Sequence, residues 1–192
     1  MTTEADGRTV YTVGHSTRTS EAFVALLRGH GVELVMDVRR FPGSRRHPQF
    51  GSAALAASLA AAGIGYQHAG ALGGRRSAGE GSASAANAAW RNAAFRAYAD
   101  YMGTAEFAAA LDHLVAASRG RATAIMCAEA VPWRCHRRLI TDALLARGVP
   151  VADITGPGPP APAVLSPHAV VAPDGRVTYP APGGVQEDLF AG

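Results

Sequence analysis

Short runs of β-branched and aromatic residues alternate along the chain with segments in which apolar residues recur at helical spacing. The first run ends at a glycine, and the helical segment after it has Thr19 as a suitable N-cap and Gly31 as a suitable stop. The pattern predicts strands at residues 10–13, 33–38, 64–68, 122–126 and 151–154. It predicts helices at residues 20–30, 52–62, 90–102, 104–119 and 135–147.

This order of elements predicts an α/β fold. Successive strand–helix–strand units form right-handed crossovers, so we expect a mostly parallel sheet with helices on both faces, a three-layer Rossmann-like arrangement. At 192 residues and 48% hydrophobic content, the chain fits one domain better than two. That domain should span residues 1–179 and include a small hairpin at 169–179, and residues 180–192 should form a flexible tail. Residues 70–88, rich in Gly, Ser and Ala, predict a long mobile loop.

Polar segments follow the predicted strands at the points where the strands end. Gly14-His15-Ser16 follows the first strand, Asp37-Val38-Arg39 ends the second, and Cys127-Ala128-Glu129 follows the fourth. Cys135-His136-Arg137 begins the next helix, where unpaired backbone N–H groups favour an anion. Ligands of open α/β sheets bind beyond the carboxyl ends of the strands, so we expect these segments to form one site.

Three residues of that site are candidates for acid–base chemistry. Asp37 and Glu129 could serve as general base or nucleophile and as general acid, the arrangement that hydrolysis of glycosidic bonds uses. His15 could carry protons near neutral pH. The alternative is structural: each carboxylate orients Arg39 or Arg137, and His15 bonds a nearby carbonyl.

The basic residues of this chain are all arginines, and more than half of the 18 fall in four short stretches. Guanidinium groups bind phosphate and carboxylate bidentately. We expect an anion site formed by Ser16, Arg39, Ser44, Arg45 and Arg137. Arg75 and Arg76 could close over it from the loop. Several aromatic residues near these stretches could stack on bases, or belong to the core: Phe41, Phe50, Tyr66, Trp90 and Trp133. Arginines scattered over a solvated surface are the alternative.

The two cysteines, Cys127 and Cys135, have seven residues between them and do not follow the CxxC spacing of zinc ribbons or thioredoxins. With His136, and with His15 or Asp37 as a further ligand, they could bind a metal. Alternatively, Cys135 near a helix N-terminus could be a nucleophile, or both could be small packed residues. The pattern leaves the cofactor open.

Four segments together resemble one protein family over nearly the whole chain: TVGHS, DVRRFPGSRRHPQF, the LGGRR loop and CAEAVPWRCHR. They are similar to the family of the domain of unknown function 488. The resemblance implies a compact α/β domain with a shared polar site. It implies no particular reaction.

The segment Gln186-Glu187-Asp188-Leu189-Phe190 resembles the pentapeptide with which bacterial proteins bind the sliding clamp. Gln186, Leu189 and Phe190 would contact the clamp, Leu189 and Phe190 as its buried anchors. The alternative is an apolar tail packed on its own domain.

We therefore expect a nucleic-acid- or nucleotide-processing enzyme that hydrolyses or transfers at a glycosidic or phosphate bond and is linked to DNA repair. A non-catalytic module that binds nucleic acid or another phosphorylated ligand is one alternative. A thiol- or metal-dependent enzyme that uses Cys127 and Cys135 is the other. No apolar run approaches the roughly 20 residues of a membrane span, and the first residues are polar, which predicts a cytoplasmic protein without membrane contact.

Overall fold

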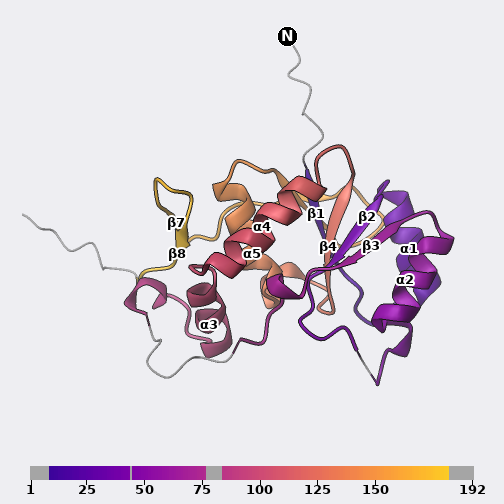
Figure 1. Ribbon diagram of the computed structural model, residues 1–192, viewed down its shortest axis with the longest axis horizontal. Helices are drawn as coiled ribbons and strands as arrows, with labels where there is room; N and C mark the ends of the chain where they lie inside the picture. Colours follow the sequence, from indigo (N-terminus) through magenta and orange to yellow (C-terminus); the bar gives the residue numbers. More distant parts are fainter. Residues whose placement is uncertain (1–8, 44, 77–83, 182–192) are drawn as a thin grey trace, which may run out of the picture.

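The computed structural model describes residues 9–43, 45–76 and 84–181, and their central element is a six-stranded sheet of order β3-β2-β4-β1-β5-β6 (Figure 1). The strands are β1 (Val10–Gly14), β2 (Leu34–Asp37), β3 (Gly65–His68), β4 (Thr123–Cys127), β5 (Val151–Ile154) and β6 (Ala161–Pro162). Strands β1 to β5 pair in parallel, and β6 runs antiparallel to β5. The predicted α/β fold with a mostly parallel sheet is confirmed.

Helices cover both faces of this sheet. Successive strand residues point to opposite faces, so on β4 the side chain of Ile125 enters one hydrophobic core while Ala124 and Met126 enter the other. The core of Ala124 and Met126 is closed by α1 (Ser20–Gly29) and α2 (Ser52–Ala61). The core of Ile125 is closed by α3 (Ala93–Tyr101), α4 (Ala105–Ala117) and α5 (Arg137–Ala146). The three layers are visible in Figure 1.

Local capping sets where the helices begin. The Thr19 hydroxyl accepts a hydrogen bond from the N–H of Ala22, as predicted. The helix expected from residue 90 begins only at Ala93, because Asn92 takes the cap position. The helix expected from residue 135 begins at Arg137, after the 3-10 turn Pro132–Arg134. Cys135 is consequently extended, with φ −144° and ψ 163°, rather than helical.

The predicted C-terminal hairpin is present, formed by β7 (Val170–Val171) and β8 (Val177–Thr178). A buried carboxylate ties the segment around this hairpin to α5. Asp142 accepts hydrogen bonds from the Ser166 N–H and hydroxyl, at 2.8 and 2.6 Å, and from the Tyr179 hydroxyl at 2.8 Å. Tyr179 is fully buried, so the end of this segment packs against the rest of the described fold.

The segment expected to be a long loop contains two 3-10 turns, Gly70–Leu72 and Ala85–Asn87, and residues 77–83 between them lie outside the described part. The predicted tail lies outside it from residue 182 onward. None of the helices in the described ranges has the length and apolar character that crossing a membrane requires.

Candidate functional site

The loops that follow β1 and β4 run side by side beyond the ends of their strands. The N–H of His15 donates to the carbonyl of Cys127 at 3.0 Å, and the N–H of Ser16 donates to the carbonyl of Ala128 at 2.9 Å. Gly14 permits this approach, since a Cβ at that position would lie 1.8 Å from the carbonyl oxygen of Glu129. The two predicted segments are therefore adjacent because the first contains a glycine.

Arg39 is held by Asp37 at the end of β2. Nε of Arg39 donates to Oδ1 of Asp37 at 2.8 Å and Nη2 to Oδ2 at 2.6 Å, a bidentate pair. Oδ2 also accepts the Tyr66 hydroxyl at 2.9 Å, and Nη2 of Arg39 donates to the carbonyl of Phe50 at 2.8 Å. Asp37 is fully buried and both of its oxygens are occupied. This geometry is that of a carboxylate that orients Arg39, and the catalytic role of Asp37 stays a prediction.

His15 lies between this arginine and the backbone of its own loop. Its Nδ1 is 2.9 Å from the carbonyl of Ser16, and its Nε2 is 3.3 Å from Nη1 of Arg39. These partners fix the proton on Nδ1 and leave Nε2 to accept from the guanidinium. The ring stacks on Phe50 with centroids 4.1 Å apart. Burial lowers the pKa of His15, and the positive charge of Arg39 lowers it further.

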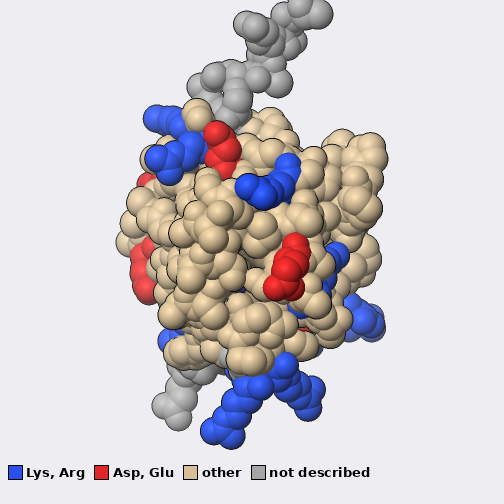
Figure 2. All heavy atoms as spheres, turned by 90° about the vertical axis from the view of Figure 1, so that its right-hand side faces the viewer, with Lys and Arg blue, Asp and Glu red and all other residues tan. Residues whose placement is uncertain are grey.

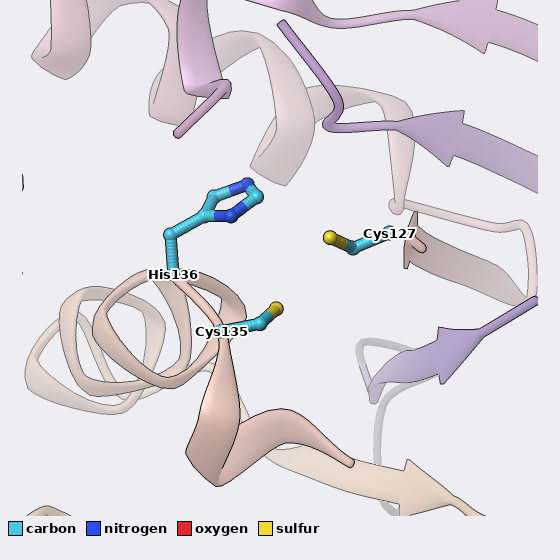
Figure 3. A group of neighbouring side chains, drawn as sticks. All are labelled: Cys127, Cys135 and His136. Carbon is cyan, nitrogen blue, oxygen red and sulfur yellow. The ribbon is translucent and has the colours of Figure 1, made fainter. Parts of the chain in front are cut away.

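Cys127, Cys135 and His136 point toward one another (Figure 3). Their candidate ligand atoms all lie within 4.8 Å of one another. Nε2 of His136 is 2.8 Å from the carbonyl of Val38, so this nitrogen carries the proton and Nδ1 is free to bind. The LGGRR loop packs on the other side of the ring, where a Cβ at Gly74 would lie 2.9 Å from Nδ1 of His136. We call these three residues the thiol–imidazole cluster.

A fully buried arginine stabilises negative charge on this cluster. The backbone N–H and Nε of Arg137 both donate to Sγ of Cys135 at 3.3 Å. Nη1 donates to the Thr12 hydroxyl at 3.1 Å, and Nη2 donates to the carbonyl of Glu129 at 2.5 Å. No carboxylate in the described ranges forms an ion pair with Arg137. A buried guanidinium stays charged, so Arg137 favours one negative charge on the pair of thiols.

The two thiols share their protons unequally. The hydrogen bond that the Cys135 thiol donates lowers the pKa of Cys127 to about 3, against the opposing effect of burial. An imidazolium at His136 and the backbone N–H of Glu129 lower it further. The same hydrogen bond raises the pKa of Cys135, and burial raises it more. Cys127 is thus the thiolate of the pair, and Cys135 retains the proton.

The cluster and the other strand-end residues line a pocket of about 400 Å³. His15, Arg39, Cys127, Glu129, Cys135 and His136 all contribute to its wall. Arginines from three further points also line it: Arg40, Arg75 and Arg134. A pocket of this size accommodates a small organic ligand, and its arginines favour an anionic one.

Not every predicted site residue lies at this pocket. Among the described residues, Ser16, Asp37, Arg45 and Arg137 are absent from its lining. Arg137 uses its donors inside the protein. Ser44 and the clamp-like residues Gln186, Leu189 and Phe190 lie outside the described part.

Sequence reasoning did not single out Arg40, Arg134 and the α3 residue Tyr98 as members of the site, although all three line the pocket. Arg40 and Arg134 each adjoin a residue or motif that was predicted. Tyr98 gave no such signal, because its spacing in the helix is that of a core residue.

The fold and site define an α/β domain with a largely buried thiol–imidazole cluster in the wall of an arginine-lined pocket. The chain belongs to the family of the domain of unknown function DUF488, whose sequence profile matches residues 19–144. That stretch includes Asp37, Arg39 and the whole cluster and ends within α5. Comparisons with curated proteins and with solved structures gave no match.

Proposed function

We propose that this protein is a metal-dependent hydrolase of nucleotide or nucleic-acid substrates, and that Cys127, Cys135 and His136 bind a zinc ion. The observation that carries the proposal is the convergence of these three ligand atoms, within 4.8 Å of one another, at the wall of an arginine-lined pocket. Two thiolates and one imidazole are a ligand set that favours Zn²⁺. Three protein ligands leave the fourth tetrahedral position for water, as in catalytic zinc sites.

The geometry around the cluster supports zinc binding in two ways. With Zn–S bonds of about 2.3 Å and Zn–N bonds of about 2.0 Å, ligand atoms of a tetrahedral site lie roughly 3.5–3.8 Å apart, so small side-chain rotations would close the site. The hydrogen bond from Nε2 of His136 to the carbonyl of Val38 is the outer-sphere contact that fixes a ligating histidine.

The buried charge of Arg137 suits such a site to hydrolysis. Two thiolates neutralise Zn²⁺, which weakens its ability to acidify a bound water. Arg137, whose Nε lies 3.3 Å from Sγ of Cys135, adds one positive charge that favours hydroxide at the fourth position. We therefore propose that Arg137 supports the cluster electrostatically.

Glu129 is the carboxylate that lines the same pocket. It would accept a proton from the bound water, and the resulting hydroxide would add to the electrophilic atom of the substrate. As the scissile bond breaks, Glu129 would return the proton to the leaving group, so that one water is consumed for each bond cleaved. Arg40, Arg75 and Arg134 would bind the phosphate of the substrate.

Metal analysis of the purified protein tests the proposal directly. We expect about one zinc per chain in the wild type and little in Cys127→Ala, Cys135→Ala and His136→Ala. His113→Ala is the matched control, because His113 is exposed and contacts Gln67 away from the cluster. Absence of stoichiometric zinc in the wild type, both as purified and after incubation with Zn²⁺, would overturn the metal site.

A turnover screen then separates an enzyme from a binding module. Nucleotides and oligonucleotides are incubated with the zinc-loaded wild type and with Glu129→Gln, which should keep its zinc and lose hydrolysis. Binding without turnover by the wild type would contradict the hydrolase and leave the non-catalytic module.

A metal-free thiol enzyme is the second candidate. It is favoured by the position of Cys127, which lies at the carboxyl end of β4, lines the pocket and has Arg134 on the same wall. In this mechanism the sulfur of Cys127 would attack the electrophilic atom of the substrate and displace the leaving group, which would take the proton of the Cys135 thiol. Water would then cleave the bond to sulfur, which returns the Cys127 thiolate and gives a proton back to Cys135. Full activity of chelator-treated, zinc-free protein, together with its loss after alkylation of Cys127, would select this candidate over the zinc enzyme.

A further inference from the structure

We infer that the pocket receives single-stranded nucleic acid, whose bases stack on Phe41, which lines the pocket, and on Trp133, which precedes the lining residue Arg134. The inference deepens the proposed function by naming the form of the substrate, and it concerns binding rather than the reaction.

Two large aromatic side chains stand out for their exposure among the described residues, Phe41 at 67% and Trp133 at 64%. The other aromatic candidates from the sequence are accounted for within the fold. Phe50 is fully buried, and the Tyr66 hydroxyl donates a hydrogen bond to Asp37. Trp90 stacks on Phe95 with ring centroids 5.0 Å apart. Rings left in water present a flat apolar face to a ligand, and nucleobases offer the complementary face.

Each exposed aromatic residue is the sequence neighbour of an arginine that lines the pocket. Phe41 follows Arg40, whose guanidinium carbon lies 5.6 Å from the centroid of the ring. Trp133 precedes Arg134. Single-stranded nucleic acids alternate a flat base with an anionic phosphate, so aromatic–arginine pairs on two loops match that alternation.

Hydrogen-bonded turns preorganise both pairs. Trp133 lies in the 3-10 turn Pro132–Arg134, which the Cys135 N–H closes onto the carbonyl of Pro132 at 3.0 Å. In the loop after β2, the Gly43 N–H donates to the carbonyl of Phe41 at 2.9 Å. Nη1 of Arg40 donates to the carbonyl of Arg75 at 3.1 Å. Preformed turns reduce the ordering cost of binding.

The charge and size of the pocket favour an unpaired strand over a duplex or a peptide. Four arginines line it, Arg39, Arg40, Arg75 and Arg134, and Glu129 is its carboxylate. Figure 2 shows basic side chains projecting together from the lower edge of the face that carries α1 and α2. A cavity of about 400 Å³ holds one or two bases, and bases can enter it or stack on its rim only when they are unpaired.

Fluorescence anisotropy of a labelled oligothymidylate of about 12 nucleotides, within the site sizes of single-strand-binding folds, tests the inference. We expect Phe41→Ala and Trp133→Ala each to weaken binding roughly five- to hundredfold, because one stacked base is lost. Trp133→Phe, which keeps a ring, should recover much of the loss. Val164→Ala is the control, since Val164 is 69% exposed but neither lines the pocket nor adjoins in sequence a residue that does.

Zinc content measured in the same variants separates this inference from the proposed function. Stoichiometric zinc with no oligothymidylate binding would overturn the single-strand inference and leave a zinc enzyme of mononucleotides. Oligothymidylate binding without zinc would overturn the zinc enzyme alone. A duplex of equal length that competes as well as the single strand would refute the stacking mode, as would equal affinity of Phe41→Ala, Trp133→Ala and the wild type.

Discussion

Replacement of Asp37 by Asn should destabilise the fold, because it removes the negative charge that compensates buried Arg39. Arg39 is 7% exposed, and Asp37 is fully buried and pairs with it through two short hydrogen bonds. Breaking a buried ion pair by removing one partner typically costs about 3–5 kcal/mol of unfolding free energy, since the other charge stays buried. In a domain of 150–250 residues, each kcal/mol shifts Tm by roughly 2–4 °C, so we expect Tm to fall by about 6–20 °C.

The chain contains its own control for this measurement. Asp174 and Arg176 have the same i, i+2 spacing as Asp37 and Arg39, and Arg176 Nε donates to Oδ2 of Asp174 at 2.6 Å. Both side chains of this second pair are largely exposed. Water and salt screen such a pair, so Asp174→Asn should change the unfolding free energy little.

Chemical denaturation of the two variants and of Asp37→Asn/Arg39→Gln would show whether the buried charge is the cause. The double variant should recover part of the stability lost in Asp37→Asn, because no charge remains buried. If Asp37→Asn unfolds like the wild type but has no activity, Asp37 is a catalytic carboxylate and its orienting role is wrong.

Three further measurements check other parts of the structure. Gly14→Ala should lose zinc and stability, because its Cβ would overlap the backbone of the loop after β4. Gly29→Ala should lose neither, because the space around Gly29 is open. Equal zinc content in the two variants would contradict the close approach of the loops. Above pH 10 the unfolding free energy should fall, because burial and the charge of Asp37 raise the pKa of Tyr66 and only the unfolded chain then loses the proton. Tyr66→Phe should weaken that pH dependence, and an unchanged slope would refute the assignment. The Leu189→Ala/Phe190→Ala variant should bind the host's sliding clamp at least tenfold more weakly than the wild type in a titration, and equal binding would remove the clamp motif.

The fold could be predicted from the sequence because its signals are local. Parallel strands buried on both faces read as continuous apolar runs, as β2 and β4 do, and Thr19 and Gly31 mark the ends of a helix. The order of the strands in the sheet could not be predicted from these local signals. That β1 lies between β4 and β5 depends on the packing of distant helices, which no window of residues encodes.

The site was predictable to the extent that parallel strands share an edge. The shared edge brings His15, Arg39 and Glu129 together, and all three line one pocket. A shared edge does not determine which charged side chains line the pocket. Asp37 lies in the same motif as Arg39, and Arg137 lies in the same motif as Glu129. Both are nevertheless fully buried and form hydrogen bonds inside the protein. The direction of a side chain at a strand end or a helix start depends on neighbours far along the chain.

The thiol–imidazole cluster shows why spacing alone gave a weak signal. In CxxC sites one tight turn presents both thiols, whereas here Cys127 ends a strand and Cys135 lies across a loop of seven residues. The loop returns to its starting point because Pro132–Arg134 forms a 3-10 turn and Nη2 of Arg137 bonds the carbonyl of Glu129. Because Cys135 is extended, the helix begins two residues later than predicted and its thiol can face Cys127. Arg137, which donates to Sγ of Cys135, thus also closes the loop that brings the two sulfurs together.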